Sequence, residues 1–229
     1  MKHTILPLFA ALALFAAAPA LAADGAHPTV VELFQSQGCS SCPPANANLM
    51  ALAGRPDILP LAFQVTYWDN LAWRDTFASP VFTGRQKDYA RALRAGVFTP
   101  EIVVNGRRDG VGINPGELRG LIAAGDRGAA GPSVALASGR VVVGPGRGGG
   151  ADVWLVRYDP RVLQVPIRGG ENAGRTLPHR NVVRQLVRLG RWDGRADAFA
   201  LPATPDPVLK SAVLVQAPGG GPILAAARL

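Results

Sequence analysis

The sequence predicts an α/β domain followed by a small all-β, sandwich-like domain. Between residues 29 and 125, strand and helix signals alternate in short, regular steps. After Gly131 and Pro132, short apolar runs separated by Gly, Pro and Asp replace this alternation. With 48% hydrophobic and 17% charged residues, the 229-residue chain can bury a core and is not a disordered protein. We expect the domains to cover residues 23–128 and 129–229.

The first 22 residues have the pattern of a signal peptide. Lys2 and His3 precede an apolar run over residues 5–18, and residues 20–22 have the small-x-small pattern of a cleavage site. An uncleaved membrane anchor is the alternative, because the apolar run is nearly long enough to span a bilayer. The cleavage pattern favours export, so we expect a periplasmic or secreted protein in an oxidising compartment.

The first strand and the first helix are predicted to meet at Cys39. Residues 29–34 form an apolar run rich in β-branched and aromatic residues, and a turn leads from it to Cys39. Helix signals begin at Cys39, because Pro43 and Pro44 suit the first turn of a helix and Gly54 suits its C-terminal cap.

The rest of the α/β domain shows equally local signals. Ser79 and Pro80 are a cap and a first residue for a second helix. Asn105-Gly106 is a strong hairpin turn, and Asn114 with Glu117 forms a capping-box start for a third helix. The expected elements are a buried strand over 58–68, a helix over 79–96, hairpin strands over 101–104 and 110–113, and a helix over 114–125.

The second domain is predicted from seven short apolar or alternating runs. They cover residues 134–137, 140–143, 153–158, 162–167, 181–189, 212–216 and 223–227. This half also carries the excess positive charge of the chain, whose net charge is +8. The excess could bind an anionic surface, or it could follow from an arginine-rich composition alone. No run of basic residues is present, so we expect no nucleic-acid partner.

The chemistry of the chain is concentrated in Cys39-Ser40-Ser41-Cys42, which holds its 2 cysteines. At a helix N-terminus, unpaired N–H groups and the helix dipole stabilise an anion, so we expect the pKa of the Cys39 thiol to be lowered. Cys39 is then the nucleophile, and the more shielded Cys42 resolves the mixed disulfide.

Other roles for the dithiol stay open. An inert disulfide is one, although closing about four residues removes only about 2 kcal/mol of unfolded-chain entropy, against about 3 for a 15-residue loop. A zinc site is disfavoured, because zinc wants four ligands and neither His27 nor His179 has ligand spacing to the pair. Cu(I) held by two thiolates is a further possibility.

The element order and the dithiol over residues 29–125 resemble the thioredoxin superfamily. The resemblance implies that the Thr99–Pro100 bond is cis and that these two residues dock the substrate. It also implies that Glu32, in the first strand, lies beneath the dithiol and relays a proton. The stretches 67–70, 77–80 and 98–100 further resemble an uncharacterised secreted family, domain of unknown function 1223, which has a thioredoxin-like domain and no known activity.

The sequence therefore predicts an exported thiol–disulfide oxidoreductase that acts through Cys39 and Cys42 on protein or small-molecule disulfides. Its partner would be a thiol or disulfide protein or a small-molecule thiol, and we expect neither a cofactor nor a metal. The alternative is a non-catalytic periplasmic binding module whose dithiol is structural or binds Cu(I). The dipeptide between the cysteines sets the redox potential, so the direction of electron flow stays open.

Overall fold

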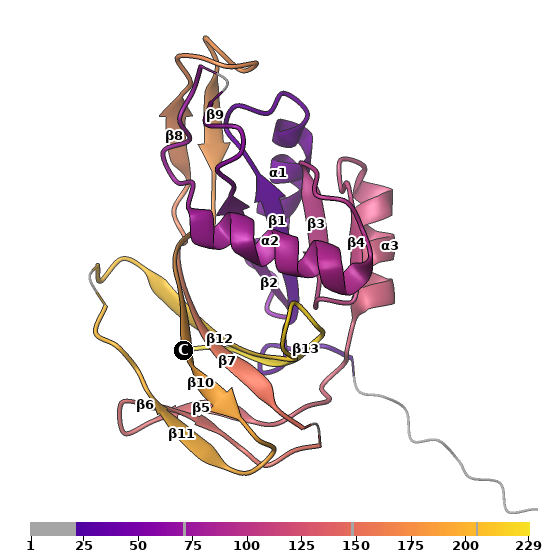
Figure 1. Ribbon diagram of the computed structural model, residues 1–229, viewed down its shortest axis with the longest axis vertical. Helices are drawn as coiled ribbons and strands as arrows, with labels where there is room; N and C mark the ends of the chain where they lie inside the picture. The colour runs from indigo at the N-terminus through magenta and orange to yellow at the C-terminus, as the bar shows by residue number, and fades with distance from the viewer. Residues whose placement is uncertain (1–21, 71, 148, 205) are drawn as a thin grey trace, which may run out of the picture.

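The computed structural model describes residues 22–70, 72–147, 149–204 and 206–229 (Figure 1). The predicted signal peptide lies outside these residues, apart from Ala22. Within them, the chain forms the three helices α1 (Cys42–Ala51), α2 (Pro80–Leu93) and α3 (Pro115–Gly125). The strands are β1 (Thr29–Gln35), β2 (Ile58–Gln64), β3 (Glu101–Val104), β4 (Arg108–Gly110), β5 (Val134–Ala137), β6 (Arg140–Val143), β7 (Ala151–Asp159), β8 (Leu163–Pro166), β9 (Thr176–His179), β10 (Val182–Trp192), β11 (Asp197–Ala200), β12 (Lys210–Gln216) and β13 (Ile223–Arg228).

A mixed eight-stranded sheet forms the centre of this α/β protein, with the order β13-β12-β7-β10-β2-β1-β3-β4. β1 and β2 are parallel, and β10 continues the sheet by pairing in parallel with β2, where Val182 lies opposite Ala62. Strands from both sides of residue 128 therefore share one sheet. The division into two domains at this residue stays a prediction.

The two faces of the sheet are covered by different elements (Figure 1). Val30 and Phe34 of β1 pack on the face covered by α2, in a cluster with Tyr89. Val31 and Leu33 point to the other face, where α1 and α3 cover them. This alternation follows from the two-residue period of a strand.

A second, three-stranded sheet, β11-β6-β5, packs against part of the eight-stranded sheet. Its Val141 and Val143 meet Val213 and Val215 of β12, and Trp192 is fully buried between the two sheets. β8 and β9 form a separate hairpin, which lies near the start of α1 at the top of Figure 1.

Several predicted boundaries need correction. After residue 131 the described chain has nine strands rather than seven, because β9 and β11 were missed and the run over 162–167 ends at Pro166. β9 contains Pro178, which has no N–H to donate to a ladder, and among the described residues it pairs with β8 alone. The second hairpin strand covers Arg108–Gly110 rather than residues 110–113.

Candidate functional site

Cys39 and Cys42 form a disulfide with a Cα–Cα distance of 5.5 Å at the junction of β1 and α1. The prediction that the helix begins at Cys39 is wrong: α1 begins at Cys42, after Ser41 as N-cap. Proline fits only the first turn of a helix, so Pro43 and Pro44 fix this start. The same prolines have no N–H, and they therefore remove two of the donors that would otherwise favour a thiolate.

The burial of the two sulfurs also differs from the prediction. Cys39 is 0% exposed and Cys42 is 1% exposed, so Cys42 is not the more shielded of the two. In the part of the chain that the structure describes, hydrogen bonds to a cysteine sulfur are found at Cys39 only. The asymmetry of the pair is therefore one of hydrogen bonding and not of exposure.

Two hydroxyl groups surround the sulfur of Cys39. Ser41 Oγ lies 3.3 Å from Cys39 Sγ, and Thr99 Oγ1 lies 3.5 Å from it. Trp68 Nε1 donates a hydrogen bond of 2.9 Å to Thr99 Oγ1. Because the indole can only donate, it leaves the single hydroxyl proton of Thr99 free to point at the sulfur. Both hydroxyls can thus donate to a Cys39 thiolate.

The structure brings the predicted residues Thr99 and Pro100 to the dithiol. The Thr99–Pro100 bond is cis, as the sequence led us to expect. Pro100 is buried, and Thr99 is half-buried beside Cys39. Trp68, which belongs to the stretch 67–70 noted above only for its family resemblance, completes this group through its bond to Thr99.

The structure does not bring Glu32 to the dithiol. Glu32 lies on the same face of β1 as Val30 and Phe34, whereas α1 packs on the opposite face. Its carboxylate is fully buried and accepts hydrogen bonds from Arg85 Nε, at 2.7 Å, and from the Tyr89 hydroxyl. Glu32 is thus the buried partner of an arginine in α2.

A distant segment, residues 171 and 172, binds the loop that carries Cys39. Asn172 is fully buried, and its Nδ2 donates to the carbonyl oxygens of Gln37, at 2.9 Å, and Cys39, at 2.8 Å. Glu171 Oε2 accepts from the backbone N–H and the hydroxyl of Ser40, at 2.9 and 2.7 Å, and these bonds lower the pKa of Glu171. Sequence reasoning missed both residues, because 131 positions separate Ser40 from Glu171 and no local signal marks the contact.

A second distant segment, which follows β2, forms hydrogen bonds with Gln37. Asp75 Oδ2 accepts from the backbone N–H of Gln37 at 2.7 Å, and Trp73 Nε1 donates to Gln37 Oε1 at 3.0 Å. Burial raises the pKa of Asp75 to about 6. The loop before Cys39 is therefore tied by side chains from two other parts of the chain.

A second buried carboxyl group, Glu101, directly follows Pro100. Gln86 Nε2 donates to Glu101 Oε2 at 2.7 Å, while Glu101 Oε1 and Gln86 Oε1 have no partner among the described residues. Burial raises the pKa of Glu101 to about 7. Sequence reasoning missed Glu101, since a single acidic residue in a short strand carries no signal.

The fold and this site define a class: an α/β protein with a mixed sheet and a buried CxxC disulfide at a strand-to-helix junction. The chain belongs to the family described as a protein of unknown function, DUF1223, whose sequence model matches residues 30–216. Within the described residues, no group of three or more His, Cys, Asp or Glu side chains could hold a metal ion. Nor does any helix there have the length and apolar character needed to cross a membrane.

Solved structures resemble this chain along most of its length. A crystal structure of a protein from Agrobacterium tumefaciens is 32% identical, covers 90% of this chain and 94% of its own, and has a TM-score of 0.72. HBP35 of Porphyromonas gingivalis is 12% identical, covers 91% of this chain and 76% of its own, and has a TM-score of 0.55. At that identity, the second likeness concerns the fold alone. A comparison with curated proteins gives no match.

Proposed function

We propose that this protein is an exported thiol–disulfide oxidoreductase with a thioredoxin-like domain, which acts on protein or small-molecule disulfides. The observation that carries the proposal is the pair of hydroxyl groups, from Ser41 and Thr99, at the sulfur of Cys39. Hydrogen bonds to the charged form lower a pKa, and the thiolate is the nucleophile in disulfide exchange. An inert disulfide needs no such donors at one of its two sulfurs.

In the reduced protein, the Cys39 thiolate attacks one sulfur of a substrate disulfide. A mixed disulfide forms, and the other substrate sulfur leaves as a thiolate. Cys42 then loses its proton and attacks Cys39 Sγ, which releases the second substrate sulfur and forms the Cys39–Cys42 disulfide. Two electrons pass from the dithiol to the substrate. The same steps in reverse oxidise a dithiol substrate.

A structural disulfide is the second candidate, and the burial of both sulfurs favours it. Because Cys39 is buried, a substrate can reach it only if neighbouring segments move, and Glu171 and Asn172 bind the loop over residues 37–40 that would have to move. A purely structural bridge would gain from permanent cover. The two candidates therefore differ in whether the disulfide exchanges while the rest of the protein stays folded.

The experiment compares Cys42→Ser with Cys39→Ser. If Cys39 attacks and Cys42 resolves, Cys42→Ser accumulates mixed disulfides with partner proteins or an added small disulfide, and Cys39→Ser traps far less. The oxidised wild-type protein, treated with dithiothreitol, should also be reduced reversibly at a defined potential while its circular dichroism stays unchanged. A disulfide that is reduced only on unfolding, together with two variants that trap nothing, would establish the structural role instead.

A further inference from the structure

A cavity of about 190 Å³ lies beside the dithiol on the side of Cys42. α1 forms one wall with Pro43, Ala47 and Met50, and β9 forms the other with Leu177. Ala47 is exposed and Met50 and Pro43 are partly exposed, while Cys42 is a buried residue of the lining. The cavity therefore extends from the surface between α1 and β9 to Cys42. Nothing in the exchange chemistry at Cys39 uses this space.

His179 is an unpaired polar group in the lining of the cavity. It is 2% exposed, and neither of its ring nitrogens has a hydrogen-bond partner among the described residues. The ring of Phe77 packs edge-on against it, with the ring centroids 6.0 Å apart. Burial lowers the pKa of His179 to about 4, so at neutral pH the imidazole has one N–H donor and one free nitrogen acceptor. Buried polar groups in folded proteins almost always have a hydrogen-bond partner, so an unpaired imidazole in a cavity indicates a ligand that forms this hydrogen bond.

The other lining groups limit what such a ligand can be. No Lys, Arg, Asp or Glu is among the lining residues. Asn46 cannot serve, since its Nδ2 already donates to the Pro178 carbonyl at 2.7 Å and its Oδ1 accepts from Gln35 at 3.0 Å. The volume is slightly larger than that of an apolar cavity of about 150 Å³ that binds benzene. The occupant is therefore uncharged, mostly apolar and of about that size.

We propose that this cavity binds an uncharged low-molecular-weight thiol with an aliphatic or aromatic group, and that its sulfur attacks Cys42. The inference rests on the proposed redox function and names a substrate class for the same dithiol. These small thiols enter at Cys42, a route that differs from the reverse of the Cys39 steps proposed for dithiol substrates. His179 accepts a hydrogen bond from the S–H group of the bound thiol. The choice of Cys42 agrees with the hydrogen bonding of the pair, because Cys39 is then the leaving sulfur and Ser41 and Thr99 stabilise its thiolate.

Two thiol molecules reduce the protein disulfide in two exchange steps. The thiol sulfur forms a bond to Cys42 Sγ, the Cys39–Cys42 bond breaks, and Cys39 leaves as the thiolate. A second thiol attacks the bound thiol sulfur, forms the free disulfide and releases Cys42 as a thiolate. Two thiols are thereby oxidised to one disulfide, the protein disulfide is reduced to a dithiol, and the two thiol protons end on Cys39 and Cys42.

The first measurement locates the mixed disulfide. The oxidised mature protein is mixed with benzyl mercaptan, which is uncharged, or with glutathione, which is charged and larger, at equal thiolate concentrations. Acid quenching and fragment-ion mass spectrometry then identify the modified cysteine. We expect the benzyl adduct on Cys42 and a reduction rate at least tenfold above that with glutathione. An adduct on Cys39, or equal rates for the two thiols, would overturn the proposal.

The second measurement narrows the cavity with Ala47→Leu and uses Ala51→Leu as the matched control. Both alanines are exposed residues of α1, but only Ala47 lines the cavity. We expect reduction by benzyl mercaptan to slow at least tenfold in Ala47→Leu alone, with the reduction potential unchanged in both variants. Equal rates would refute the cavity route and leave the redox function standing. A wild-type disulfide that dithiothreitol also fails to reduce in the folded protein would refute the redox function and the cavity route together.

Discussion

Replacing Glu101 with glutamine should stabilise the protein increasingly as the pH rises. The folded state holds the pKa of this carboxyl at about 7, above its ordinary value of 4.5. Between these two pH values the unfolded chain gives up the proton while the folded protein keeps it, so the free energy of unfolding falls as the pH rises. One pKa unit corresponds to about 1.4 kcal/mol, and the whole difference therefore costs about 3 kcal/mol above pH 7. The introduced glutamine side chain would still accept the hydrogen bond from Gln86 Nε2, and its own amide N–H could donate to the unpaired Gln86 Oε1.

Urea unfolding of both proteins, monitored by circular dichroism between pH 4 and pH 9, measures this difference. Glu101→Gln and wild type should be equally stable near pH 4, and the variant should gain up to about 3 kcal/mol by pH 9. Glu101→Ala is the control, because it removes the same charge but also leaves a cavity. Its stability should differ from that of Glu101→Gln by an amount independent of pH. If the difference in the free energy of unfolding between wild type and Glu101→Gln stayed constant across this pH range, Glu101 would not be held protonated. The argument from burial would then be refuted.

Three further predictions concern other parts of the molecule. Asn172→Ala removes the two hydrogen bonds that close the loop at Cys39, so dithiothreitol should reduce the disulfide several-fold faster than in the wild type. Asn48→Ala is the matched control, because the Asn48 amide donates to the carbonyl groups of Gly112 and Ile113 and should leave the rate unchanged. Equal rates in the two variants would show that Asn172 does not control access to the disulfide. Arg157→Leu removes the buried guanidinium that donates to the carbonyl groups of Pro202 and Ala203, and it should lower the free energy of unfolding by about 1.5–3 kcal/mol. Arg188→Leu, which breaks an exposed ion pair with Asp152, should cost less than about 1 kcal/mol in the same denaturation assay. If the basic half binds an anionic surface, the whole protein should bind anionic vesicles less tightly as the salt concentration rises, because charges are screened beyond about 8 Å at physiological ionic strength. Equal sedimentation with anionic and neutral vesicles would exclude that role.

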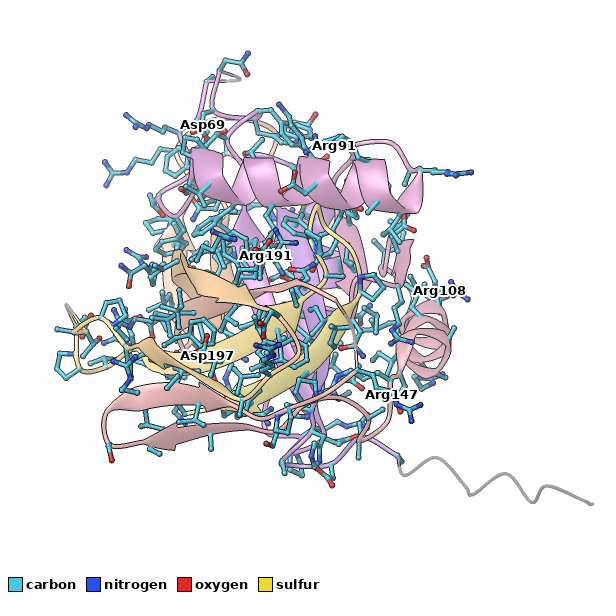
Figure 2. The ribbon with its side chains drawn as sticks, turned by 60° about the horizontal axis from the view of Figure 1, so that its bottom comes forward. Asp69, Arg91, Arg108, Arg147, Arg191 and Asp197 are labelled. Atoms are coloured by element: carbon cyan, nitrogen blue, oxygen red, sulfur yellow. A yellow bond between two sulfur atoms is a disulfide. The ribbon has the colours of Figure 1, made fainter. Side chains whose placement is uncertain are left out.

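The excess of arginine shows how far composition can mislead. Arg157 is 2% exposed and binds backbone carbonyl groups, and Arg228 donates to the carbonyls of Arg55, Pro56 and Ile58. Both arginines thus bind backbone carbonyl groups, and the buried Arg157 is not available to a partner. The arginines that Figure 2 labels, Arg91, Arg108, Arg147 and Arg191, lie on separate parts of the molecule. Net charge counts all of these residues alike, although part of the basic excess is internal.

Local signals in the sequence predicted local structure well. Ser79 caps α2 through Val81 N, and Asn114 caps α3 through the backbone N–H groups of Gly116 and Glu117. The capping box is only half formed, because Glu117 Oε1 accepts from Val111 N instead of reaching back to Asn114. A cap depends on residues three positions apart, so a single sequence contains the information needed to predict it.

The relations between distant segments could not be predicted in the same way. The residues of any strand alternate between its two faces, but the sequence of β1 could not show that α1 would cover the face opposite Glu32. The pairing of β10 with β2, at Val182 and Ala62, joins segments separated by two helices and several strands. Apolar runs can pair with many partners, and the choice is made by packing across the whole sheet.

The hydrogen bonds between Asn172 and the Cys39 loop bear on when the disulfide can form during synthesis. The amide that donates to the carbonyl oxygen of Cys39 comes from a residue 133 positions later in the chain. Synthesis begins at the N-terminus, so both cysteines leave the ribosome before Asn172 does. During that interval the loop that carries Cys39 lacks the hydrogen bonds of Asn172. The disulfide can therefore form before the loop that carries Cys39 is tied to residue 172.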